Sequence, residues 1–380
     1  MAKLLFLISE DWFFCSHFME RAKAAQAEGF EILVFTREGR HGAQIRGAGF
    51  RLLPLSMDRS GTNLWKELGV LRQVWRVYRE ERPALLHHVA LKPIIYGSLA
   101  ARLSGLRALL NAPVGMGYLF TSRGLKVALL QPLVSLLLKG LLNPRGSRVV
   151  FENAEDLQTS VDRGTVRAGD AVLIQGAGVD TALYHPVESP AGLPIVVMAA
   201  RMLKDKGVAE YVAAAQLLRE RGVAARFWLV GAPDKGNPSS FTEAELAAWQ
   251  ASGAVEWLGH RDDMADVLRQ GHLACLPSYR EGLPKFLLEA MATGLAVVST
   301  DTTGCRQAVD DGVTGLLVPV RDAAALADAL QRLIADADMR ARMGAAGRER
   351  ALREFSSEQV VAQTLLVYQR LAAPSKPAPA

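Results

Sequence analysis

Short apolar, often β-branched runs alternate with helical patterns along both halves of the chain. The expected strands of the first half are residues 4–8, 31–35, 50–55, 84–88, 108–112, 148–151 and 171–174. Those of the second half are residues 195–199, 226–230, 254–258, 272–277, 296–300 and 315–318. Alternation of this kind is typical of parallel sheets covered by helices. The sequence therefore predicts an α/β protein with two doubly wound, Rossmann-like domains in series.

Residues 184–194 hold three prolines and a glycine, which is typical of a linker between domains. We place the first domain at residues 1–185 and the second at residues 192–355. A C-terminal helix over residues 356–372 can cross back to the first domain. The Pro- and Ala-rich tail 373–380 is predicted to be disordered.

The expected strand 272–277 leads into a loop with Glu281 and Gly282, and a helix begins near Pro284, with Glu289 further along. The N-terminus of a helix binds anions through its free N–H groups and its dipole. The two flanking carboxylates suit sugar hydroxyls better than phosphates. This combination favours a phosphate joined to sugars on both sides, as in a nucleotide sugar.

A second segment, residues 200–207, follows the first strand of the second half and carries Arg201 and Lys206. Parallel strands present their carboxyl ends at one edge of the sheet, so both cations are expected in the same crevice as Glu281. Two cations and a helix dipole would stabilise a departing diphosphate. No Asp-x-Asp stands at an expected strand end, so we expect neither a metal nor a cofactor beyond the donor substrate.

The net charge of +5 is unevenly distributed: residues 82–151 contain no Asp or Glu but nine Lys and Arg. The same window includes the apolar stretch 127–142, which favours contact with an anionic membrane surface. The alternative is a buried core helix with a few solvated lysines. The basic residues are not interleaved with aromatic ones, so nucleic acid is not expected as a partner.

Two further observations bear on the compartment. The three cysteines are widely separated, as expected for reduced thiols of a cytoplasmic protein. No signal peptide is recognisable, and no window reaches the length of apolar residues that spans a bilayer. We therefore expect a cytoplasmic protein that lies at the inner face of the membrane.

The motifs of the second half resemble those of the retaining GT-B glycosyltransferases of family 4. They comprise residues 176–180, 200–207, 229–231, 257–260 and 313–319, and Glu281 and Glu289 with seven residues between them. The resemblance implies that Arg201 and Lys206 bind the donor diphosphate, that Glu281 holds the sugar hydroxyls and that Glu289 holds the ribose. It also implies that the 282–286 loop contacts the phosphate or sugar of the donor, through Gly282, Leu283, Lys285 and Phe286. The base would contact the segment after the third strand of the second half, at Gly259, His260 and Arg261. Lys285 either touches the donor or pairs with a neighbouring acid.

The first half, at residues 10–17, 87–93 and 115–118, resembles bacterial transferases that extend polyprenyl-diphosphate-linked sugars. Many members of the family carry a histidine after the fifth strand, whereas residues 111–115 contain none. His88 and Lys92, near the end of the fourth strand, are therefore our candidates for catalytic residues. Asp11 and His17 are candidates for contacts with the acceptor.

These features together predict transfer of a hexose or N-acetylhexosamine, with retention, from a UDP-sugar to a polyprenyl-diphosphate-linked sugar. The product would enter a bacterial surface polysaccharide or a glycoprotein glycan. Transfer to a soluble acceptor, a sugar-nucleotide epimerase and a non-catalytic assembly subunit remain as alternatives.

Overall fold

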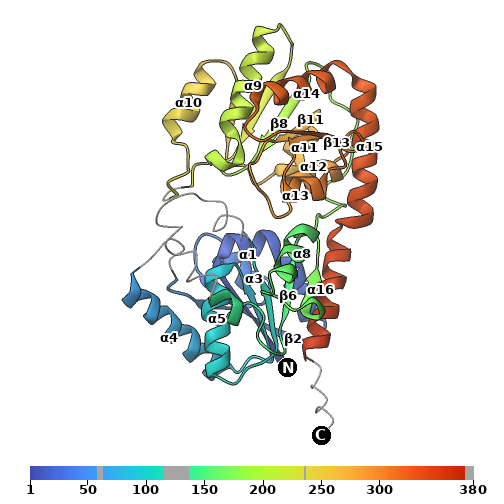
Figure 1. The fold of residues 1–380 in the computed structure, drawn as a ribbon. Helices are drawn as coiled ribbons and strands as arrows, with labels where there is room; N and C mark the ends of the chain where they lie inside the picture. Colours follow the sequence, from blue (N-terminus) through green and yellow to red (C-terminus); the bar gives the residue numbers. More distant parts are fainter. Residues whose placement is uncertain (58–62, 115–136, 235–236, 373–380) are drawn as a thin grey trace. The chain divides into compact units, whose positions relative to one another are not determined.

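The computed structural model describes residues 1–57, 63–114, 137–234 and 237–372. The chain forms two compact units (Figure 1). The first comprises Met1–Ala177 and the C-terminal segment from Glu358, and the second comprises Gly178–Ser357.

The first unit is built on a parallel sheet of seven described strands, in the order β3-β2-β1-β4-β5-β6-β7. The strands are β1 (Ala2–Glu10), β2 (Phe30–Arg37), β3 (Arg51–Pro54), β4 (Leu85–Val89), β5 (Leu109–Ala112), β6 (Arg148–Phe151) and β7 (Ala171–Leu173). The helices are α1 (Asp11–His17), α2 (Met19–Ala27), α3 (Gly42–Gly47), α4 (Leu64–Glu81), α5 (Leu91–Leu103), α8 (Ala154–Asp162) and α16 (Ser357–Ala372).

The second unit has a parallel sheet whose six strands, among its described residues, are in the order β10-β9-β8-β11-β12-β13. The strands are β8 (Ile195–Ala199), β9 (Arg226–Val230), β10 (Glu256–Gly259), β11 (Leu273–Leu276), β12 (Ala296–Thr300) and β13 (Gly315–Val318). The helices are α9 (Val208–Glu220), α10 (Glu243–Ala251), α11 (Met264–Arg269), α12 (Lys285–Ala292), α13 (Thr303–Ala308), α14 (Ala323–Ala335) and α15 (Ala337–Glu354), and η2 (Lys204–Lys206) is a 3₁₀ turn.

The strand order reverses once in each sheet, between β1 and β4 and between β8 and β11. Ligands of doubly wound sheets bind outside the carboxyl ends of the strands at such a point. The predicted α/β class with two Rossmann-like units is confirmed, and each unit has one topologically favoured binding edge.

Alternating residues of β1 explain why helices cover both faces of the first sheet. Leu4, Phe6 and Ile8 pack into one apolar cluster, while Leu5 and Leu7 pack into another. Successive side chains of a strand point to opposite faces, so an uninterrupted apolar run indicates a strand buried on both sides.

The boundary between the units lies at Ala177/Gly178, before the predicted boundary at residue 185. Val179 N–H donates to Phe355 O at 2.9 Å, and Ser357 N–H donates to Val179 O at 2.9 Å, so the backbone pairs within the second unit. The expected linker also packs on this unit, since His272 Nε2 lies 2.9 Å from Pro190 O. Its prolines interrupt regular structure but do not detach the segment.

The C-terminal helix α16 belongs to the first unit. The hydroxyl group of Tyr368 on this helix lies 2.7 Å from Nδ1 of His87, on β4. Both side chains are buried, so the contact fixes α16 against the first sheet. The expected disordered tail, 373–380, lies outside the described residues.

The apolar stretch 127–142 is described only from residue 137. Leu138 and Leu142 are buried and pack with Ile94 and Val149. The described end of the stretch thus fits the alternative of a core helix, and residues 127–136 lie outside the described residues. Among the helices of the described ranges, none is long and apolar enough to cross a membrane.

Candidate functional site

Lys206 and Glu281 form an ion pair at the point where the second sheet reverses its strand order. Lys206 Nζ lies 2.6 Å from Glu281 Oε1, and the two side chains are 18% and 12% exposed. Lys206 follows β8 and Glu281 follows β11, and these strands are neighbours in the sheet. The predicted meeting of these two residues is therefore present in the structure.

Gly207 makes this approach of the two loops possible. Its φ of +73° is in the left-handed region, and an added Cβ would overlap the carbonyl oxygen of Pro277. Two further hydrogen bonds join the loops, because Asp205 O accepts from Tyr279 N at 2.9 Å and from Ser278 Oγ at 3.0 Å. The backbone thus positions Lys206 and Glu281 before any ligand binds.

Arg201 pairs with Asp234, a residue that the sequence analysis did not single out. Arg201 Nη1 lies 2.6 Å from Asp234 Oδ2, and both side chains are partly exposed. Asp234 N–H donates to Ser240 Oγ at 2.9 Å, which fixes the loop after β9. The signal was available: an acid a few residues after the expected strand 226–230 lies at the same sheet edge as Arg201.

Glu289 is buried on α12 and bonded to two side chains. Lys285 Nζ lies 3.4 Å from Glu289 Oε1, and the Tyr184 hydroxyl donates to the carboxylate. Burial raises the pKa of Glu289 above its ordinary value, while Lys285 and Tyr184 oppose the rise. Lys285 therefore pairs with a neighbouring acid in this structure, as one of its two predicted alternatives states. Tyr184 was not identified from the sequence, because it was assigned to the edge of the linker.

The first turn of α12 follows Pro284, which occupies the N-cap position rather than the first helical position. Leu287 N–H donates to Pro284 O at 3.0 Å, so the N–H groups of Lys285 and Phe286 precede the first intrahelical bond. The side chains of Leu283 and Phe286 are buried. The predicted donor contacts of these two residues would therefore have to come from their backbone groups.

The segment after β10 joins the same sheet edge through backbone contacts. Gly231 N–H donates to Gly259 O at 2.7 Å, and Trp257 Nε1 donates to Gly231 O at 2.8 Å. His260 is exposed and Arg261 is partly exposed, and they pair with Asp262 and Asp263. The predicted contact of this segment with a base stays a prediction.

His88 does not lie at a ligand-binding edge but in the core of the first unit. Its side chain is fully buried, with Nδ1 2.8 Å from Asn111 Oδ1 and Nε2 2.9 Å from the Tyr78 hydroxyl. An amide oxygen only accepts, so Nδ1 carries the proton and Nε2 accepts from Tyr78. Burial lowers the pKa of His88 to about 4. The predicted catalytic role is therefore replaced by a structural one.

The Asp11 carboxylate is likewise bonded to groups of its own unit. Its buried carboxylate accepts N–H bonds from Trp12 at 2.7 Å, Gly39 at 2.7 Å and His41 at 2.9 Å. It thereby closes the loop after β2, and this geometry does not support direct contact with an acceptor. His17 is half-buried and stacks on Phe13, with 4.0 Å between the ring centroids.

Lys92 lies at the start of α5 and pairs with Glu67 on α4, with 2.8 Å between Nζ and Oε1. The Tyr96 hydroxyl donates to the second oxygen of Glu67. Lys92 remains partly exposed at the edge where β4 ends. Of the two catalytic candidates in the first unit, Lys92 is the better placed, although its charge is already paired.

Two family models match the chain over ranges that do not overlap. Residues 3–151 match "Glycosyl transferase 4-like", and residues 193–336 match "Glycosyl transferases group 1". Together they take in most of both units. The chain belongs to the glycosyltransferases. The predicted family and enzyme class are thus confirmed.

Two curated relatives show how the similarity of this glycosyltransferase is distributed. The N,N'-diacetylbacillosaminyl-diphospho-undecaprenol alpha-1,3-N-acetylgalactosaminyltransferase of Campylobacter jejuni is 27% identical over 370 residues, covering 93% of this chain and 95% of the relative. The alpha-maltose-1-phosphate synthase of Mycolicibacterium smegmatis is 34% identical over 228 residues, covering 54% and 58%. The first similarity includes both units, and the second is partial.

Solved structures of two proteins share the fold of this glycosyltransferase. The sucrose-phosphate synthase of Thermosynechococcus elongatus has a TM-score of 0.80 at 22% identity, covering 98% of this chain and 100% of that chain. HepE of Anabaena in complex with UDP and glucose has a TM-score of 0.79 at 18% identity, covering 97% and 100%. These likenesses support the GT-B fold.

Among the described residues of the glycosyltransferase, no group of three or more His, Cys, Asp or Glu side chains is placed to hold a metal ion. The motif 115–118 and the basic residues Arg123 and Lys126 lie outside the described residues, so their predicted roles stay predictions.

Proposed function

We propose that this glycosyltransferase moves a hexose or N-acetylhexosamine, with retention, from a UDP-sugar to a polyprenyl-diphosphate-linked sugar. The observation that carries the proposal is the Lys206–Glu281 pair at the β8/β11 edge of the second unit. It places a cation and a carboxylate side by side, which is what a diphosphate joined to a sugar requires.

The donor would bind by exchange of ionic partners. Lys206 and Arg201 turn from Glu281 and Asp234 to the diphosphate, and the N-terminus of α12 supplies N–H groups. Glu281 is then free to accept hydrogen bonds from the sugar hydroxyls. Preorganised cations stabilise the charge that develops on the departing diphosphate, which is often the largest contribution to catalysis.

The chemical step breaks the bond between the anomeric carbon and the diphosphate oxygen. An acceptor hydroxyl forms the new bond on the same face, and its proton passes to the departing UDP. No metal or further cofactor is part of the proposal, because the cations of the protein supply the charge. Retention in this form needs no covalent sugar–enzyme intermediate.

The acceptor class rests on the Campylobacter relative, whose name specifies a diphospho-undecaprenol-linked acceptor and whose similarity spans both units. We propose that the first unit binds an acceptor of this class. Its product would belong to a bacterial surface polysaccharide or glycoprotein glycan, and the enzyme would work at the cytoplasmic face of the membrane.

The direct test is an assay of the purified enzyme with a panel of UDP-sugars and a short-chain polyprenyl-diphosphate-linked sugar. We expect one UDP-sugar to release UDP only when the acceptor is present, and NMR of the product to show the anomeric configuration of the donor. Transfer to a free sugar alone would favour the soluble acceptor. Conversion of the UDP-sugar without any acceptor would favour the epimerase.

A further inference from the structure

The outward face of α4 carries an unusual set of side chains for a helix exposed to water. Trp65 is 82% exposed and Leu68 is 48% exposed, and both lie in the first turns of the helix. Arg72, Arg76 and Arg79 follow, all exposed. Because these positions recur at intervals of three and four residues, they lie along one stripe of the helix.

The opposite side of α4 fixes the orientation of this stripe. Val70, Val74 and Tyr78 are buried in the apolar cluster of the first unit. Asn63 caps the helix by accepting N–H bonds from Trp65 and Lys66. The helix packs beside α5 (Figure 1). The exposed stripe is thus held rigidly outward.

The acidic residues of α4 do not neutralise the stripe. Glu67 is bonded to Lys92 and Tyr96, and Glu81 to Lys3 and Arg51. Glu80, near the C-terminal end, lies at the margin of the face. The outward face is therefore cationic along its length, with an aromatic and an aliphatic residue at its start.

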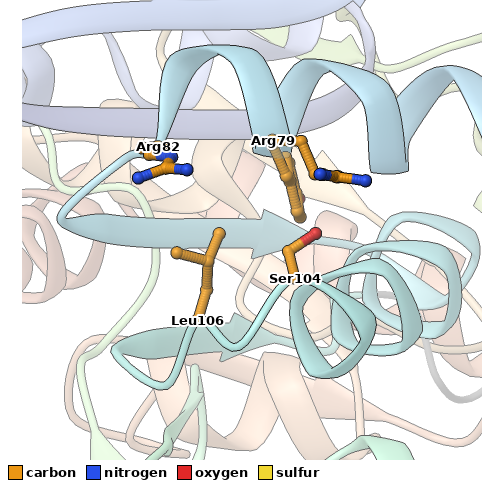
Figure 2. A pocket seen from close by; sticks show the side chains of 5 residues that line it. Arg79, Arg82, Ser104 and Leu106 are labelled. Atoms are coloured by element: carbon orange, nitrogen blue, oxygen red, sulfur yellow. The ribbon is translucent and has the colours of Figure 1, made fainter.

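The stripe ends at a hollow lined by Tyr78, Arg79, Arg82, Ser104 and Leu106 (Figure 2). Its volume is about 340 Å³. The hydroxyl oxygen of Ser104 is buried and has no hydrogen-bond partner among the described residues. Two guanidinium groups and one unbonded hydroxyl suit the phosphate of a lipid headgroup.

We propose that the outward face of α4 docks this enzyme on an anionic membrane surface, with Trp65 and Leu68 in the interface and the arginines against headgroup phosphates. Trp at the headgroup level and Arg beside it are the pattern of helices that lie on a membrane. Glu67 links the base of this face to Lys92, at the ligand-binding edge of the same sheet. The inference rests on the proposed lipid-linked acceptor and names the surface that brings the enzyme to it.

The test compares three forms of the full chain in flotation with phosphatidylcholine vesicles and with vesicles that also contain phosphatidylglycerol. We expect wild type to float with the anionic vesicles at low salt and less as salt rises. Arg72→Ser with Arg76→Ser should weaken the apparent affinity by about tenfold or more. The matched control is Arg332→Ser with Arg342→Ser, which removes two exposed arginines from the second unit and should bind like wild type.

A second readout reports on Trp65 itself. The other five tryptophans are buried or half-buried, so vesicle addition should shift the emission of wild type to the blue and leave Trp65→Phe nearly unchanged. A blue shift that appears with the anionic vesicles but not with phosphatidylcholine vesicles alone would match the docking mode. Thermal melting of each variant should stay close to wild type, because the altered side chains are exposed.

Three outcomes would overturn the inference: wild type that ignores anionic vesicles, an α4 variant that binds as tightly as wild type, or a control variant that loses as much affinity. Failure of the proposed function looks different. In that case vesicle binding depends on α4, but no UDP-sugar is transferred to the short-chain lipid-linked acceptor in detergent. Transfer in detergent by the α4 variant, with lost transfer on vesicles, supports both.

Discussion

Both units carry polar residues at or beyond the carboxyl ends of the strands that flank the reversal of strand order, but these residues differ in their contacts and exposure. In the second unit, Lys206 and Glu281 meet each other at the sheet edge and remain partly exposed. In the first unit, His88 and Asp11 are enclosed by partners from their own unit. Position in a parallel sheet therefore brings a side chain to an edge or near it, but the partners decide whether a ligand can use it.

The largest expected effect tests the second unit. Lys206→Ala removes the cation paired with Glu281, and we expect kcat/KM for transfer from the UDP-sugar to fall about 10²–10³-fold, as when one preorganised charge partner of a transition state is lost. Lys204→Ala, two residues away and exposed, is the matched control and should change little. Equal losses of kcat/KM in both variants would show that Lys206 has no specific role in the donor site.

The second prediction tests the first unit through the protonation of His88. Its pKa is about 4 in the folded protein against an ordinary value of 6.5, so the unfolded chain binds more protons between these values. The stabilisation is complete above pH 6.5 and is lost as the pH falls towards 4, by about 3 kcal/mol in the free energy of unfolding. His88→Gln should flatten this dependence relative to wild type while kcat at neutral pH changes little.

The comparison with wild type matters because the pKa of His87 is also lowered by burial and acts in the same direction. Only the difference between the two pH profiles reports on His88. If His88→Gln remains folded and loses activity a hundredfold or more, as expected for a lost catalytic group, then His88 is catalytic and the contrast between the units fails.

The third prediction concerns the glycine that brings the two loops of the second unit together. Gly207→Ala places a Cβ against the carbonyl oxygen of Pro277 and requires a positive φ, so the free energy of unfolding should fall by about 2–3 kcal/mol. Gly222→Ala has a nearly identical φ of +74° but open space around it, and should cost about 1–2 kcal/mol. A chemical denaturation series measures both. Equal losses would show that φ alone, and not the contact with Pro277, fixes the loop.

The sequence predicts the second unit better than the first for a physical reason. Arg201, Lys206 and Glu281 lie a few residues past strands whose ends a parallel topology must bring together. The partners of His88 are Tyr78 on α4 and Asn111 on β5, and their meeting depends on side-chain packing that no local pattern encodes.

Two other differences between the prediction and the structure also arise from contacts that no local pattern encodes. Tyr184 and Pro190 lie in a proline-rich segment that is typical of a linker, but hydrogen bonds with Glu289 and His272 hold it on the second unit. The place of Asp234 after β9 indicates the same sheet edge as Arg201, but the direct pairing of the two side chains depends on how the irregular loop folds. The topology of the sheets can be predicted from the sequence, whereas the ionic partner of each side chain depends on how the loops fold.

The smallest expected effect tests whether Arg201, like Lys206, exchanges its ionic partner for the donor diphosphate. Asp234 competes with the donor diphosphate for Arg201, so Asp234→Asn should leave the guanidinium available and tighten UDP binding about two- to fivefold, the range set by partly exposed ion pairs. Asp328→Asn breaks a pair of the same length with Arg221 on the surface of the second unit and should leave UDP affinity unchanged. Isothermal titration with UDP measures both variants. Weaker binding by Asp234→Asn would mean that Asp234 orients Arg201 for the diphosphate rather than competing with it, and the exchange of partners would then apply to Lys206 alone.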